Sequence, residues 1–102
     1  MNDLAYKILT AEQFAQWQAD GTFTGAPVDL ADGYIHLSTA EQLTETLEKH
    51  FAGQSGLVVA TVDLALLADT VRWEPSRGGA LFPHVYGPLP LVAMVEFERV
   101  SG

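Results

Sequence analysis

The sequence contains no cysteine, which excludes every kind of site that depends on a thiol. No disulfide can cross-link the chain, no thiolate cluster can bind zinc, and no thiol can act as a nucleophile. The sequence also lacks a run of about 18 uncharged apolar residues and a basic, apolar leader at its N-terminus. We therefore expect a cytoplasmic chain without a membrane partner.

Basic residues are scarce: 5 Lys and Arg stand against 13 Asp and Glu, for a net charge of −8. A surface of this charge repels nucleic-acid backbones and anionic membranes, so we expect a small-molecule ligand and no nucleic-acid partner. The charges of residues 70–102 balance, and Arg72 and Arg77 flank Trp73 and Glu74 there. A small anion is tolerable beside these arginines, although the simpler interpretation is that both are solvated surface charges.

The remaining composition is that of a folded domain. Hydrophobic residues make up 48% of the chain and charged residues 18%, and 102 residues correspond to one domain, 1–102. We expect the α+β class, with two helices and about six short strands in one mixed, mainly antiparallel sheet. Its oligomeric state stays open.

Capping boxes predict the two helices. Thr10 precedes Gln13 by three residues, which is the pattern of a helix N-terminus, and the second helix has two overlapping boxes, Ser38 with Glu41 and Thr39 with Gln42. The first helix is expected to end at Gly21 and the second near Gly53, while the stretch 22–33 reads as a loop.

The strands are predicted from residue type and alternation. They are expected at 6–9, 34–38, 57–62, 71–74, 81–86 and 91–99, with one helical turn at 64–67 and a mobile loop at 76–79. The aliphatic run 57–62 indicates a central strand covered on both faces. Pro83 cannot donate a backbone hydrogen bond, which favours an edge or a bulge for strand 81–86.

Two of these strands carry unusual faces. Tyr34, His36 and Ser38 alternate onto one face of the first, and Phe82, His84 and Tyr86 share a face of the second. Rings, imidazoles and hydroxyls are what the floor of a ligand cleft needs, and we expect any ligand to lie beside His36, Trp73, His84 and Tyr86. Ser38 also precedes a helix N-terminus, which favours a phosphate or carboxylate.

Each of these residues also has a structural explanation. A histidine on a strand is often a hydrogen-bonded structural residue, Tyr86 can simply pack, and Trp73 can anchor the core beside Val71. Glu74 can form only a modest ion pair with Arg72. We expect no metal site, because the three histidines are widely spaced, and the sequence has no Gly-rich phosphate loop, serine elbow or zinc-protease helix.

Three segments together resemble the bacterial family known as domain of unknown function 952: residues 33–39 (GYIHLST), 71–75 (VRWEP) and 81–91 (LFPHVYGPLPL). That family is uncharacterised, and its fold is similar to that of the ADP-ribosyltransferases. The second resemblance implies NAD as a candidate substrate rather than a fixed cofactor, with His36 and Ser38 on its adenosine side and Tyr86 or Phe82 against the nicotinamide. It implies Glu74 as the carboxylate that stabilises the sugar cation, although Leu37 stands where a glycine is usual.

Three functions are compatible with these residues. The first is a pocket that binds NAD, a related nucleotide or a small anionic metabolite through His36, Ser38, Tyr86 and His84, with catalysis optional. The second is a histidine-dependent hydrolase or phosphoryl-handling enzyme, in which His36 and His84 are acid and base. The third is a non-enzymatic module whose aromatic face binds a metabolite or a partner chain.

Overall fold

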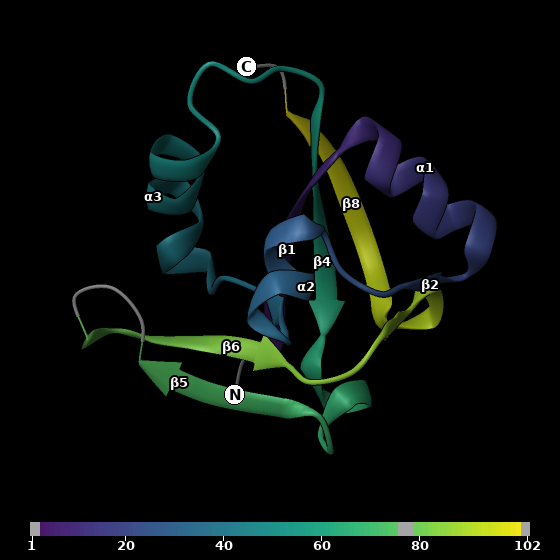
Figure 1. Cartoon of the computed structure of the whole chain (residues 1–102), viewed down its shortest axis with the longest axis vertical. Helices are drawn as coiled ribbons and strands as arrows, with labels where there is room; N and C mark the ends of the chain where they lie inside the picture. The colour runs from purple at the N-terminus through teal and green to yellow at the C-terminus, as the bar shows by residue number, and fades with distance from the viewer. Residues whose placement is uncertain (1–2, 76–78, 101–102) are drawn as a thin grey trace.

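Three small sheets and three α-helices make up the part of the chain that the computed structural model describes, residues 3–75 and 79–100 (Figure 1). The sheets are β1-β4-β8, β2-β7 and β3-β6-β5, and their strand pairings are antiparallel. The strands are β1 (Leu4–Thr10), β2 (Thr22–Phe23), β3 (Ile35–His36), β4 (Leu57–Asp63), β5 (Val71–Pro75), β6 (Leu81–Val85), β7 (Leu89–Pro90) and β8 (Met94–Val100). The predicted α+β class is confirmed, whereas the single six-stranded sheet is wrong.

Strand β4 is the centre of the largest sheet. It pairs with β1 on one side and β8 on the other, and six of its seven residues are buried. The continuous aliphatic sequence therefore predicted its position correctly, because a strand covered on both faces has no solvent-facing side to make polar. One 3-10 turn follows it at Leu64–Leu67, as expected, and a second precedes β8 at Leu91–Ala93.

Helices α1 (Ala11–Asp20) and α3 (Ala40–His50) lie on opposite sides of this sheet (Figure 1). The capping boxes at Thr10 and Thr39 are present, with each threonine hydroxyl accepting from the glutamine backbone N–H and each glutamine side chain accepting in return. Of the two overlapping boxes predicted for α3, the helix therefore uses that of Thr39 and not that of Ser38. Gly21 ends α1 in the left-handed conformation, as predicted, with φ 77°. Helix α3 ends at His50, three residues before the predicted boundary.

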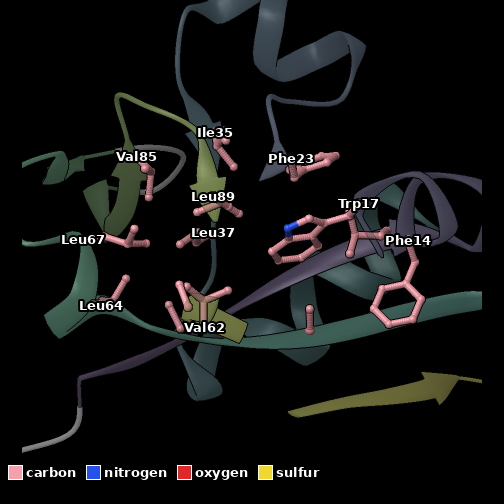
Figure 2. Packing of buried hydrophobic residues seen from close by; sticks show 14 of the residues in the cluster. Phe14, Trp17, Phe23, Ile35, Leu37, Val62, Leu64, Leu67, Val85 and Leu89 are labelled. Carbon is pink, nitrogen blue, oxygen red and sulfur yellow. The ribbon is translucent and has the colours of Figure 1, made fainter. Parts of the chain in front are cut away.

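The two sides of the sheet carry separate apolar clusters. Helix α1 buries Phe14 and Trp17 in the main cluster, which Figure 2 shows together with Phe23 and Val62. The second cluster consists of Ile8, Leu57 and Val59, and the partly buried Leu43, Leu47 and Phe51 pack against it.

No helix among the described residues is long and apolar enough to cross a membrane.

Helix α2 (Pro27–Asp32) occupies the stretch that was predicted to be a loop, and that prediction is wrong. Proline is favoured at the first helical position, and the carboxylate of Asp29, the third helical residue, accepts the N–H of the N-cap residue Ala26 at 2.7 Å. Gly33 ends the helix at φ 88°. Short β2 (Thr22–Phe23) also lies within the supposed loop and pairs with β7.

Strand β6 is the middle strand of its sheet and pairs with β3 and β5 in an unbroken register, so the edge or bulge predicted from Pro83 is wrong. The carbonyl of Pro83 accepts the Leu37 N–H at 3.1 Å, on the side of β3. In an extended strand the nitrogen of a residue points to the same side as its carbonyl, and β3 has already ended at His36. Pro83 therefore lacks its N–H on the side of β3, beyond the last residue of that strand, where the pairing of β3 with β6 requires no further donor.

Candidate functional site

A cleft of about 530 Å³ lies beside β3 and β6, and helices α2 and α3 contribute to its walls. Five residues that the sequence singled out line it together: Tyr34, His36, Ser38, Phe82 and His84. They converge because β3 and β6 are neighbours, although 46 positions separate His36 and Phe82 in the chain. The cleft has the size range of small-molecule sites, about 300–1,000 Å³.

The pairing of β3 with β6 puts both histidines on one face. His36 is directly opposite His84 in the register, and the centroids of the two rings are 5.5 Å apart. Tyr34 stacks on His84 at 4.1 Å with an interplanar angle of 23°, and its ring also lies 4.7 Å from that of His36. The three rings form one continuous wall, which offers flat apolar area to a ligand.

His84 is held by a carboxylate. Its Nδ1 lies 2.7 Å from Glu74 Oε1, and the Tyr86 hydroxyl donates to both oxygens of Glu74 at 2.8 and 3.1 Å. The hydrogen bond from His84, followed by that from Tyr86, lowers the pKa of Glu74 below its ordinary value. The hydrogen bond to Glu74 in turn raises the pKa of Tyr86.

This contact fixes the tautomer of His84. A carboxylate accepts and does not donate, so the proton of the neutral ring is on Nδ1 and a lone pair is on Nε2. Within the described residues Nε2 has no hydrogen-bond partner, although the ring lines the cleft. His84 therefore presents a proton acceptor to whatever occupies the cleft.

Asp29 is the buried centre of the adjoining network, with an exposed fraction of 2%. Its carboxylate accepts from Lys7 Nζ at 2.9 and 3.2 Å, from His36 Nδ1 at 2.6 Å and from two backbone N–H groups. Burial raises its pKa, but the hydrogen bond from His36, the charge of Lys7 and the other donors outweigh this and bring the pKa to about 2. Burial lowers the pKa of Lys7, although the charge of Asp29 opposes this change.

His36 lies between two carboxylates of α2. Its Nδ1 contacts Asp29, and its Nε2 lies 2.9 Å from Asp32 Oδ2. Because both partners only accept, both contacts are hydrogen bonds only when the ring is an imidazolium. His36 therefore fastens α2 to β3, and it has no ring nitrogen left for a ligand while both contacts are made.

The other predicted site residues lie outside the cleft lining. Glu74 contacts the lining residue His84, and Tyr86 contacts Glu74 and lies 5.2 Å, ring to ring, from the lining residue Tyr34. Tyr86 also lines a second hollow of about 380 Å³ together with Tyr34. Trp73 is opposite Pro83 in the register, so it lies on the other face of the sheet from His84 and is half exposed. Arg72 is on the face of His84, but its guanidinium donates to the Val71 carbonyl. Arg77 lies outside the described residues, as does most of the predicted loop 76–79.

Sequence reasoning missed four polar residues of the site: Lys7, Asp29, Asp32 and Thr46. The signal for Lys7 was its place between Ala5 and Leu9 on a face that is otherwise core, where an ammonium needs a buried partner. Asp29 lay in a supposed loop, although a proline followed by Gly33 matches the ends of a short helix. Among the described residues, no group of three or more acidic or histidine side chains could hold a metal ion.

The model of the family described as "Protein of unknown function (DUF952)" matches residues 8–97. The chain belongs to this family. It is similar to protein CC0527 of Caulobacter crescentus, whose crystal structure has a TM-score of 0.90 at 46% identity, with 93% of this chain and 83% of that chain covered. The solution structure of CC0527 gives 0.87 at 44% identity, with 98% and 86% covered. No curated protein matches the chain.

Proposed function

We propose that this member of the family binds a nucleotide-class ligand in the cleft and that His84 is the acid–base group of the site. The observation that carries the proposal is the contact between His84 Nδ1 and Glu74, 2.7 Å long, which leaves Nε2 as the acceptor in the cleft. A histidine oriented by a carboxylate is the arrangement that enzymes use for proton transfer. Glu74 then acts as a positioning residue through His84.

The walls of the cleft favour a ligand that combines a ring with hydroxyl groups. Tyr34, His84 and Phe82 offer ring faces or edges, and Ser38, Thr46 and Tyr6 add hydroxyls. Nucleosides and nucleotides have both kinds of group. The resemblance of His36-Leu37-Ser38 to the strand that holds the adenosine side of NAD in the ADP-ribosyltransferases makes NAD the first candidate within this class.

Amide-shift mapping tests ligand binding. The full chain is titrated with NAD, ADP-ribose, AMP and inorganic phosphate, and we expect at least one nucleotide to move the amides of residues 34–38 and 82–85. The Trp73→Ala variant is the control, because Trp73 lies on the other face of the sheet and its removal should leave these shifts in place. If no compound in the panel moves any of these amides, the proposal is wrong.

A Glu74→Gln variant tests the acid–base role. The variant keeps an acceptor for Tyr86 but loses the charge that holds the His84 tautomer, so turnover of a substrate should fall by about 10²- to 10⁴-fold while binding persists. The pH profile of kcat should change with it. Tyr86→Phe is the matched control, since it removes the other partner of Glu74 and leaves His84 in contact; a fully active Glu74→Gln enzyme would contradict the role.

The second candidate function is a histidine-dependent hydrolase or phosphoryl-handling enzyme. The 5.5 Å separation of the His36 and His84 rings on one face favours it, because an acid and a base must reach the same substrate. The contacts of His36 with Asp29 and Asp32 oppose it. His36→Gln distinguishes the two functions: the variant should lose turnover entirely in the hydrolase and retain it in a site that uses His84 alone.

A further inference from the structure

The cleft has no free cation among its described lining residues. Lys7 is the single Lys or Arg of that lining, and its ammonium is fully engaged: two of its contacts are to Asp29 and the third is to the His36 carbonyl at 3.1 Å. Arg72 lies on the same face of the sheet but outside the lining, with its guanidinium on the Val71 carbonyl. A phosphate inside the cleft would find no described cationic partner.

Two carboxylates beside the same space form no ion pair with a lysine or arginine among the described residues: Asp32, which contacts His36, and Glu74, which contacts His84 and Tyr86. The third, Asp29, is paired with Lys7, and the charge of Arg72 acts on Glu74 from outside the lining. The Asp32 side chain is 46% exposed at the cleft. Burial and then the charges of Asp32 and Glu74 raise the pKa of the Tyr34 hydroxyl, so both carboxylates act on the wall of the cleft.

Three neutral side chains of the cleft, those of His84, Ser38 and Thr46, offer acceptors to a ligand, whereas the hydroxyls of Tyr6 and Tyr34 can also donate. When the His84 ring is neutral, its proton is on Nδ1 toward Glu74 and Nε2 has a lone pair. Thr46 donates its hydroxyl to the Gln42 carbonyl, so Ser38 must donate its own hydroxyl to Thr46, and only lone pairs of Ser38 remain for a ligand. Hydroxyl, amine and amide N–H groups fit such a surface, whereas a phosphate brings only further acceptors.

We infer that the cleft selects a neutral or cationic ring that carries hydrogen-bond donors, and that any phosphate of the ligand stays outside it. The inference rests on the proposed function and names its substrate class: the nucleoside half of a ligand enters, and its phosphate does not. It reverses the expectation of an anion beside Ser38. The first turn of α3, next to Ser38, already carries Glu41, which offsets the positive end of the helix dipole.

Matched ligand pairs test the inference by titration of the full chain. Adenosine is compared with AMP, and nicotinamide riboside with nicotinamide mononucleotide, so that each pair differs by one phosphate. We expect the phosphate to weaken binding by about fivefold, the size of one unfavourable charge contact. Nicotinamide riboside should also bind more tightly than its uncharged reduced form, and added salt should remove that difference.

An Asp32→Asn variant tests the source of the selectivity. It should narrow the gap between adenosine and AMP by about two- to fivefold, because one carboxylate of the wall is neutralised. Asp20→Asn is the control for net charge, since Asp20 is on α1, away from the cleft, and bonds only Gln16 among the described residues. The Asp32→Asn substitution could displace α2, because Asp32 contacts His36. The salt dependence of ligand binding is therefore also measured on the wild type, where α2 is unchanged.

The outcomes separate this inference from the proposed function. If the phosphorylated member of each pair binds as tightly as the nucleoside or more tightly, the selectivity is wrong and the nucleotide-class cleft still stands. If neither nucleosides nor nucleotides bind, the proposed function fails and this inference fails with it. If AMP and nicotinamide mononucleotide each bind more weakly than the matching nucleoside, the result supports the proposed function and the selectivity against phosphate.

Discussion

At the scale of single residues, the site depends on groups that hold the two histidines rather than on the histidines alone. Glu74 sets the tautomer of His84, and Asp29 holds His36 together with Lys7. The sequence identified both histidines, because their strands alternate polar and aromatic residues where a solvent-facing strand would carry charges. It could not identify Asp29, since nothing local shows that one carboxylate collects donors from three elements.

The pKa of Asp29 predicts how stability changes with acid. In the folded chain it falls from 3.8 to about 2, so the carboxylate stabilises the fold fully above pH 4, and this stabilisation is lost as the pH falls through about 2. The contribution is roughly 2 kcal/mol. Urea unfolding at a series of pH values should show the loss within that window.

The Asp29→Asn variant gives the matching test. At neutral pH it should lose about 3 kcal/mol of unfolding free energy, because the Lys7 ammonium stays buried without its counter-charge. Its stability should also vary less between pH 4 and pH 2 than that of the wild type. The control is Asp20→Asn, which removes an exposed carboxylate and should lose as much unfolding free energy between pH 4 and pH 2 as the wild type. If Asp29→Asn also loses as much, other carboxyl groups cause the loss.

At the scale of elements, the best predictions came from local chemistry. The capping boxes at Thr10 and Thr39, the left-handed glycine after α1 and the buried β4 depend on neighbouring residues alone, and all are present. The edge or bulge predicted for β6 was wrong because the consequence of Pro83 depends on where β3 ends. Whether the strands form one sheet or three is likewise a matter of long-range pairing, which residue types do not specify.

Helix α2 offers a test of how an element supports the site. Gly33 ends it at φ 88° with open space around the position of a Cβ, so Gly33→Ala should cost about 1–2 kcal/mol through backbone strain alone. Gly21→Ala is the matched control at the end of α1, with φ 77° and the same open space. Thermal unfolding should show similar losses in both variants, but only Gly33→Ala should weaken ligand-induced shifts, because Asp29 and Asp32 are on α2. If the ligand-induced shifts are equal in the two variants, the end of α2 does not support ligand binding.

At the scale of the whole molecule, the cleft lies where two sheets meet, since Tyr6 and Lys7 of β1 line it together with residues of β3 and β6. The β1-β4-β8 sheet carries much of the core, and the cleft residues His36, Phe82 and His84 are on the β3-β6-β5 sheet. Hydrogen exchange should therefore be slowest in β4, which is paired on both edges and buried. The amides of β5 should exchange faster, since that strand is largely exposed. Equal protection of the two strands would mean that both sheets open as one unit.

The chain has two tryptophans, and they occupy the two halves of this arrangement. Trp17 is fully buried in the main core, whereas Trp73 is 48% exposed on the back of the sheet that carries His84. Their fluorescence should differ accordingly, with emission from Trp17 at shorter wavelength than that from Trp73. A Trp73→Phe variant leaves an optical reporter of the core alone, and Trp17→Phe leaves one for the sheet of the cleft. The two parts of the molecule can then be observed separately in solution without any attached label.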